Sequence, residues 1–343
     1  MDGWTDGVAS ADGRIFGVPD HAEAVLCIDS ELGTAETFGE VGLGAQKWSG
    51  GVLAQDGKIY CIPWSHPSVL QIDPSDKSVD FISLEAPDAL AELARDAVSE
   101  EHKWRGGILA PNGKIYGIPW NADTVLLIEP QKSSCRTFGK VPDTGSKWAG
   151  AAIAPNGKIY CAPYDAESVL IIDTEKDTVS TIGRFQFGKR RWRGMVLAGN
   201  GKLYAIPYNS IEVLCIDPED DSITTFGMVG GIRCKWRGGV LAPDGCIYCV
   251  PDCASTVLKI DPENHENLEE FGELPERRWK WRGGVLGGDG AIYCAPYETS
   301  GNVLSIDPRE KRAALLGATE LPQKAQLPGV LNRFGELLCV PTA

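Results

Sequence analysis

A cationic and aromatic tripeptide stands before two glycines in the stretch KWRGGILAPNGKIYGIPW, which runs from Lys103 to Trp120. Lysine and arginine bind anionic groups, and both can also contact the face of an aromatic ring. The same tripeptide pattern recurs along the chain. It predicts either a ligand-binding surface or a device that joins the repeats to one another.

The tryptophan of this stretch marks a repeat that covers the whole chain. Most steps are 44 residues, and the copies before the last carry tryptophan at Trp4, Trp48, Trp104, Trp148, Trp192, Trp236 and Trp281. An eighth copy, Gln326 to Pro341, has Gln326 at the tryptophan position. The repeats therefore start near residues 4, 48, 104, 148, 192, 236, 281 and 326. A period of about 40–45 residues with short strands is typical of propeller blades.

Each copy predicts four short strands. An apolar run with two glycines leads to an Asn-Gly or Asp-Gly turn, as at Asn112-Gly113, and then to a run such as KIYCIP. Runs such as SVLQIDP and a segment ending in TFG predict the third and fourth strands. We predict an all-β, seven-bladed β-propeller that forms a single domain over residues 1–343. Eight blades with an incomplete last blade is the alternative, because the first two strands occur eight times and the last two seven times.

The blade pattern resembles that of NHL-repeat, virginiamycin-lyase-like and gluconolactonase-like propellers. The resemblance lies in the "DG-hydrophobic…V-x-x-ID" style of the blade and extends over the whole chain. It implies the propeller fold. No catalytic residue is transferred from these families to this chain.

One face of the predicted propeller gathers cationic and aromatic side chains. The loop that enters the first strand and the loop between the second and third strands open on the same face of a blade. We expect this face to bind ligand through Arg105, Arg193, Arg237, Arg282, Lys103, Lys235, Lys280, Trp120, Tyr164, Tyr208 and Tyr297. Such a rim suits an anionic or planar ligand or an acidic protein segment.

A structural role for the same residues is the competing interpretation. A tryptophan repeated in every blade packs between blades, and the lysines can lie over it or pair with the aspartate of VLxID. The arginines are the better candidates for ligand binding, because Thr5, Ser49 and Ala149 replace them in three copies.

An insertion departs from the repeat between Trp48 and Trp104. Residues 86–101 carry Pro87 near the start and apolar residues at three-to-four spacing, which predicts an amphipathic helix. The helix is either a decorated loop packed on its own blade, or a lid or docking element.

Composition limits the classes of partner. The net charge of −14 and a pI near 4.8 argue against general nucleic-acid or anionic-membrane binding, and no apolar run is long enough for a membrane-spanning helix. The 11 cysteines do not form a disulfide pattern, and they favour a reducing, cytoplasmic location. The abrupt start inside the first repeat is compatible with a fragment, and the chain could also be a subunit of a larger assembly.

Catalysis has little support in the sequence. The histidines His21, His66, His102 and His265 are scattered, and neither a metal-binding spacing nor a phosphate loop is present, so we predict no catalytic residue, metal or cofactor. The expected function is a non-catalytic scaffold that binds a protein partner or an anionic ligand. The alternatives are a metal-assisted hydrolase, lactonase or lyase with its site at the channel mouth, and a carbohydrate-binding propeller.

Overall fold

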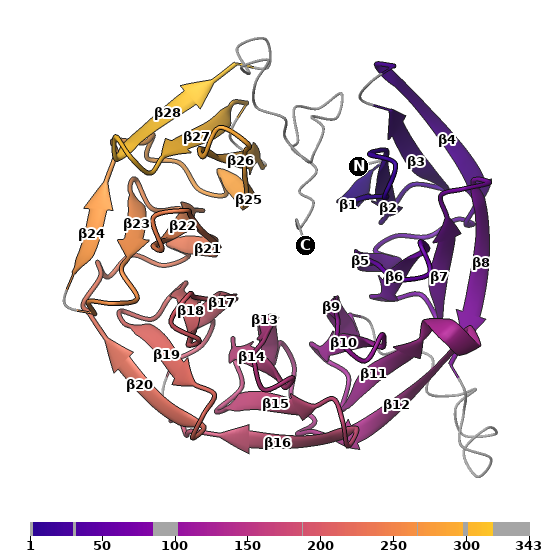
Figure 1. Ribbon diagram of the computed structural model, residues 1–343, viewed down its shortest axis with the longest axis horizontal. Helices are drawn as coiled ribbons and strands as arrows, with labels where there is room; N and C mark the ends of the chain where they lie inside the picture. The colour runs from indigo at the N-terminus through magenta and orange to yellow at the C-terminus, as the bar shows by residue number, and fades with distance from the viewer. Residues whose placement is uncertain are drawn as a thin grey trace. The chain divides into compact units, whose positions relative to one another are not determined.

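The computed structural model describes residues 3–29, 32–84, 102–186, 188–265, 267–297 and 301–317. These residues form seven four-stranded sheets, each built from four consecutive strands (Figure 1). The fold is an all-β, seven-bladed β-propeller, as predicted. Among the described residues one 3₁₀ turn, η1 (Pro130–Lys132), is the sole helical element. The predicted helix at 86–101 and the eighth copy, Gln326 to Pro341, lie outside the described residues.

The chain divides into two compact units, and the first comprises residues 1–147 and 172–179. It holds the first three sheets. Their strands are β1 (Trp4–Ala9), β2 (Ile15–Pro19), β3 (Ala24–Asp29), β4 (Thr34–Glu40), β5 (Trp48–Leu53), β6 (Ile59–Pro63), β7 (Ser68–Asp73), β8 (Ser78–Ser83), β9 (Trp104–Leu109), β10 (Ile115–Pro119), β11 (Thr124–Glu129) and β12 (Ser134–Lys140).

The second unit comprises residues 148–171 and 180–343. The fourth sheet contributes residues 172–179 to the first unit and its other residues to the second. Its strands are β13 (Trp148–Ile153), β14 (Ile159–Pro163), β15 (Val169–Asp173) and β16 (Thr178–Ile182). The last three sheets contain β17 (Trp192–Leu197), β18 (Leu203–Pro207), β19 (Val213–Asp217), β20 (Ser222–Phe226), β21 (Trp236–Leu241), β22 (Ile247–Pro251), β23 (Val257–Ile260), β24 (Leu268–Phe271), β25 (Trp281–Leu286), β26 (Ile292–Pro296), β27 (Val303–Asp307) and β28 (Arg312–Leu316). A single domain over residues 1–343 stays a prediction.

The turn between the first two strands of a sheet forms as its sequence predicts. Gly113 has a φ of +77°, which the left-handed region allows at little cost for glycine. The backbone N–H of Ala110 donates to the carbonyl of Lys114 at 2.9 Å, and the side chain of Asn112 accepts from the N–H of Lys114 at 3.0 Å. β9 and β10 therefore pair antiparallel.

Burial changes from strand to strand within each sheet. Every residue of the second strand is buried, as in β10, whereas most residues of the fourth strand are partly or fully exposed, as in β4. Apolar side chains of consecutive sheets then meet in a shared core. Phe16, Trp48 and Ile59 belong to one such cluster in the first unit, and Tyr204 and Trp236 belong to another in the second.

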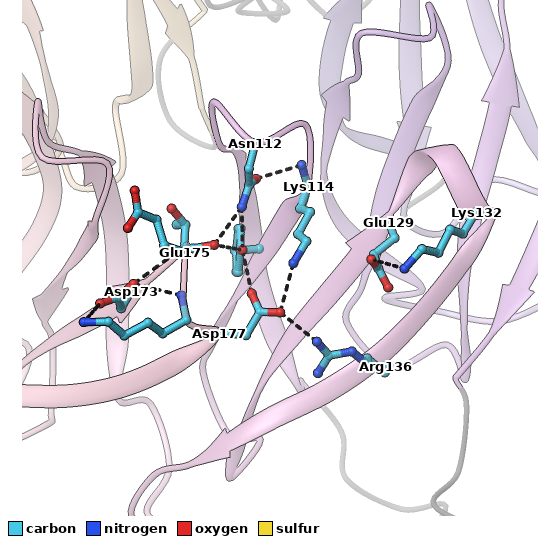
Figure 2. Close-up of polar contacts among 11 residues, drawn as sticks. Asn112, Lys114, Glu129, Lys132, Arg136, Asp173, Glu175 and Asp177 are labelled. Carbon is cyan, nitrogen blue, oxygen red and sulfur yellow. Dashed lines mark hydrogen bonds and ion pairs between the residues drawn. The ribbon is translucent and has the colours of Figure 1, made fainter.

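Hydrogen bonds and ion pairs between polar side chains also join consecutive sheets, and Figure 2 shows them in the first unit. We call the contacts around Asp177 the latch. Asn112 donates to the carbonyl of Thr174 at 2.8 Å. Asp177 accepts from the hydroxyl of Tyr116 at 2.9 Å and forms ion pairs with Lys114 at 2.9 Å and Arg136 at 2.7 Å. The asparagine contact recurs in the second unit, where Asn156 donates to the carbonyl of Pro218 and Asn200 to that of Pro262.

Candidate functional site

The repeated tryptophans are structural. Six of the seven are buried, and the indole nitrogen of each donates to a backbone carbonyl 20 or 21 residues later, at or just before the third strand of the same repeat. In Trp236 this bond reaches the carbonyl of Thr256 at 2.8 Å. The contacts of these rings therefore agree with the predicted packing role. The buried rings offer no face to a ligand.

The lysines before these tryptophans direct their ammonium groups to backbone carbonyls. The Nζ atom of Lys235 donates to the carbonyl of Ser210 at 2.7 Å, that of Lys280 to Ala254 at 2.7 Å, and that of Lys103 to His66 at 2.8 Å. Lys235 and Lys280 are each 1% exposed. Burial lowers the pKa of Lys235 to about 8 and also lowers that of Lys280. These three lysines were expected to bind ligand, and their ammonium groups instead lie on the backbone.

The arginines that follow the tryptophans occupy the next position on the first strands of three consecutive sheets. Arg193 lies on β17, Arg237 on β21 and Arg282 on β25, which are neighbouring strands of the second unit (Figure 1). The carboxylate of Asp252 interacts electrostatically with all three. We call Arg193, Arg237, Arg282 and Asp252 the arginine cluster.

Tyrosine rings line the arginine cluster. The guanidinium carbon of Arg282 lies 4.3 Å from the ring centroid of Tyr297, and that of Arg237 lies 5.4 Å from the same centroid. Arg193 lies 5.2 Å from the ring centroid of Tyr208 and 5.7 Å from that of Tyr164. Contacts of this kind hold a guanidinium plane while its N–H groups stay directed outward from the ring.

Asp252 is the buried negative charge of the cluster. Its exposed fraction is 0%, and its Oδ2 atom accepts a hydrogen bond from the hydroxyl of Tyr208 at 3.2 Å. Its Oδ1 atom is buried and has no hydrogen-bond partner. Burial raises the pKa of Asp252, and the charges of Arg237 and Arg193 oppose that rise.

The three positive charges also act on one another. Burial, followed by the charges of Arg193 and Arg282, lowers the pKa of Arg237 from its ordinary value. Within the part of the chain that the structure describes, the guanidinium groups of Arg193 and Arg237 make no hydrogen bond and no ion pair within 4.0 Å. Both residues are partly buried. The guanidinium groups of Arg193 and Arg237 are therefore partly desolvated cationic donors that hydrogen-bond to none of the described residues.

The first unit has a separate arrangement around Arg105. Its guanidinium carbon lies 4.5 Å from the ring centroid of Trp120 and 5.8 Å from that of Trp64. The ring of His102 stacks on Trp64 at a centroid distance of 4.7 Å. Trp120 is 9% exposed, so its ring is covered mainly by its neighbours.

The structure thus brings six of the predicted site residues together in the second unit, namely Arg193, Arg237, Arg282, Tyr164, Tyr208 and Tyr297. Sequence reasoning did not select Asp252. Its signal was present, because Asp252 follows Pro251 at a position where other repeats carry Trp64, Trp120, Tyr164, Tyr208 or Tyr297. Asp20 is the other acid at this position, but its copy carries Thr5 where the copy of Asp252 carries Arg237.

The described residues also bear on metal binding, disulfide bonds and membrane spanning. No group of three or more His, Cys, Asp or Glu among them is placed to hold a metal ion. All ten cysteines that the structure describes are free thiols, and Cys61, Cys161, Cys249 and Cys294 are fully buried. No helix in the described ranges combines the length and the apolar character needed to cross a membrane.

The fold is similar to that of solved enzymes. The structure of selenomethionine-substituted virginiamycin B lyase from Staphylococcus aureus has a TM-score of 0.66 and 14% identity, covering 86% of this chain and 92% of that one. A catalytically inactive variant of that lyase with quinupristin has a TM-score of 0.65 and 15% identity, with coverage of 86% and 92%. Hydrazine synthase of Kuenenia stuttgartiensis has a TM-score of 0.62 and 14% identity, with coverage of 93% and 97%.

No protein-family model matches the sequence, and no curated protein matches it. At identities near 14% the similarity establishes the propeller fold and says nothing about activity. The predicted likeness to virginiamycin-lyase-like propellers is confirmed at the level of fold.

Proposed function

We propose that the chain is a non-catalytic binding protein whose arginine cluster takes a small anionic ligand. The observation that carries this proposal is the pair of partly buried guanidinium groups of Arg193 and Arg237, whose donors make no hydrogen bond or ion pair with the described residues. Guanidinium donors in a partly desolvated place bind carboxylate and phosphate groups strongly and with defined geometry. Arg282 adds a third positive charge beside them.

Partial burial favours a small anion over a folded protein partner. A protein surface needs exposed side chains over a broad area, whereas Arg193 and Arg237 are recessed among tyrosine rings. A carbohydrate-binding propeller would stack sugar rings on exposed aromatic faces, but six of the repeat tryptophans are buried. The anionic ligand is therefore the better supported of the binding functions.

Calorimetric titration of succinate into the protein at low ionic strength tests the proposal. Arg237→Gln removes a cluster guanidinium, and Arg233→Gln removes an exposed arginine on the preceding loop as a matched control. We expect measurable binding to the wild type, at least about a tenfold loss for Arg237→Gln, and unchanged binding for Arg233→Gln. Equal losses in both variants would show a general charge effect and contradict the proposal.

A lyase is the competing function, because virginiamycin B lyase shares the fold. Incubating the wild-type chain with quinupristin and Mg²⁺, followed by mass spectrometry, tests it directly. We expect intact quinupristin. A cleaved product that is lost in Arg237→Gln would reassign the arginine cluster to catalysis.

A further inference from the structure

The charge of the arginine cluster defines the class of anion that it accepts. We propose that the ligand is a small dianion, a dicarboxylate or a phosphate monoester; this rests on the proposed function. Arg193 and Asp252 both contact Tyr208, and Arg237 and Arg282 share the ring of Tyr297. Three guanidinium groups and one carboxylate give the cluster a net charge of +2. A dianion neutralises this charge, whereas a monoanion leaves a positive charge and a trianion adds a negative one.

The buried position of Asp252 makes the charge balance matter. When water screens a group of ions, an excess of one charge costs little free energy. Partly buried ions are screened much less, so the same excess costs more. Asp252 is fully buried, so its negative charge belongs to the cluster and is not accessible to a ligand. It acts on the ligand through the three arginines and is a positioning residue.

Two other ionisable groups near the cluster present no charged donor to a ligand. Lys280 also interacts electrostatically with Asp252, but its ammonium group donates to the carbonyls of Ala254 and Arg277. Tyr208 is neutral, because burial raises its pKa. We therefore expect the guanidiniums of Arg193 and Arg237 to bind the ligand, with the charge of Arg282, which donates to the hydroxyl of Tyr297 at 3.4 Å, beside them.

The backbone brings the arginine-bearing strands close to one another. A Cβ atom on Gly194 would lie 2.7 Å from the Cα atom of Gly238, so β17 and β21 approach closely just beside Arg193 and Arg237. Arg237 and Arg282 in turn share the ring of Tyr297. A ligand with two negative charges a few bonds apart can reach more than one guanidinium.

A charge series tests the proposal by calorimetry at pH 8. Butyrate, succinate and tricarballylate carry one, two and three carboxylates, and methyl phosphate is a dianion there because its second pKa is about 6. For the wild type we expect succinate to bind about tenfold more tightly than butyrate, and tricarballylate no more tightly than succinate. The comparison of methyl phosphate with succinate tells which headgroup the site prefers, and tight binding of either supports the proposal.

The variant Asp252→Asn raises the cluster charge to three positive charges with little change in shape. We expect it to bind tricarballylate at least about fivefold more tightly than succinate. Arg193→Gln lowers the cluster charge to +1, and we expect butyrate to bind it as tightly as succinate. This second variant keeps the test valid if Asp252→Asn fails to fold, and Arg233→Gln again serves as the control.

The outcomes separate the two proposals. If the wild type binds none of the four anions, the proposed function itself is wrong. If it binds butyrate, succinate and tricarballylate equally, anion binding stands and the dianion proposal is overturned. An unchanged order of preference in both Asp252→Asn and Arg193→Gln would also overturn it.

Discussion

Gly194 and Gly238 lie so close that a Cβ atom on Gly194 would be 2.7 Å from the Cα atom of Gly238. A Cβ atom on Gly150 would likewise lie 2.5 Å from the Cα atom of Gly194. The glycine two residues after the tryptophan is thus what allows the first strands of successive sheets in the second unit to approach. Gly194 also has a φ of +91°, in the region that favours glycine.

Replacing Gly194 by alanine is expected to destabilise the protein by about 3 kcal/mol. The left-handed backbone costs about 1–2 kcal/mol for a residue with a Cβ atom, and the contact with Gly238 adds about 1–3 kcal/mol. Gly245→Ala is the control, because Gly245 has a φ of +79° but nothing within 4 Å of a Cβ atom. Urea unfolding measures the free energy of unfolding of both variants. Equal losses of this free energy would show that the contact with Gly238 costs nothing.

The latch around Asp177 predicts a stability that depends on pH. Although burial raises the pKa of Asp177, hydrogen bonds from Lys114 and Tyr116 lower it overall. Asp177→Asn should cost about 1–3 kcal/mol at pH 7, because Lys114 and Arg136 lose their partner.

The sign of the pH effect follows from the lowered pKa. The stabilising contribution of Asp177 is present above the ordinary aspartate pKa and is lost as the pH falls through the lowered value. The difference between wild type and Asp177→Asn should therefore shrink below pH 4, as followed by thermal unfolding at several pH values. Asp80→Asn, at an exposed position, should show no such difference; a gap that persists at low pH contradicts the prediction.

The sequence carries most of the information about the fold because the complete four-strand repeat occurs seven times. The Asn-Gly and Asp-Gly turns, the apolar runs and the spacing of tryptophans determine where each strand begins, and every first strand starts at its tryptophan. The packing role of the rings was also predictable, since a residue repeated in each blade serves the repeat.

The site was predictable only in part, because it depends on contacts between repeats. The sequence does place Arg193, Arg237 and Arg282 on consecutive first strands, because each directly follows the tryptophan of its repeat. The sequence does not reveal that Lys235 donates to the carbonyl of Ser210. Every residue has a backbone carbonyl, so the residue types do not indicate which one accepts a hydrogen bond. Nor does it reveal that Asp252 is buried beside the arginines, because that depends on how side chains of three sheets pack.

The buried ammonium group of Lys235 gives a test in alkaline solution. Lys235→Met should destabilise the protein by about 1–3 kcal/mol at pH 7, because the carbonyl of Ser210 loses its buried donor. Its pKa is lowered to about 8 by burial, so the folded state binds fewer protons than the unfolded state above that pH. The contribution of Lys235 to stability therefore rises with pH between about 8 and the ordinary lysine value of about 10.4.

The stability gap between wild type and Lys235→Met should accordingly widen from pH 7 to pH 10 in urea unfolding. Lys189→Met removes an exposed lysine and should change stability by less than about 0.5 kcal/mol at either pH. A gap that narrows with rising pH would show that the ammonium group is not the desolvated cation described here.

Asp252→Asn is expected to stabilise the protein at neutral pH, although it removes the only carboxylate of the arginine cluster. The pKa of Asp252 is raised because burial outweighs the attraction of the arginines, so the folded state disfavours the ionised form. Between the ordinary and the raised pKa the folded state binds more protons than the unfolded state, and stability falls as the pH rises. Wild type and Asp252→Asn should therefore melt at similar temperatures near pH 4 and diverge by pH 8, with the variant higher. A wild type that melts higher at pH 8 would mean that the arginines hold Asp252 as a stabilising counterion, and the melting curves of the two proteins decide between these cases.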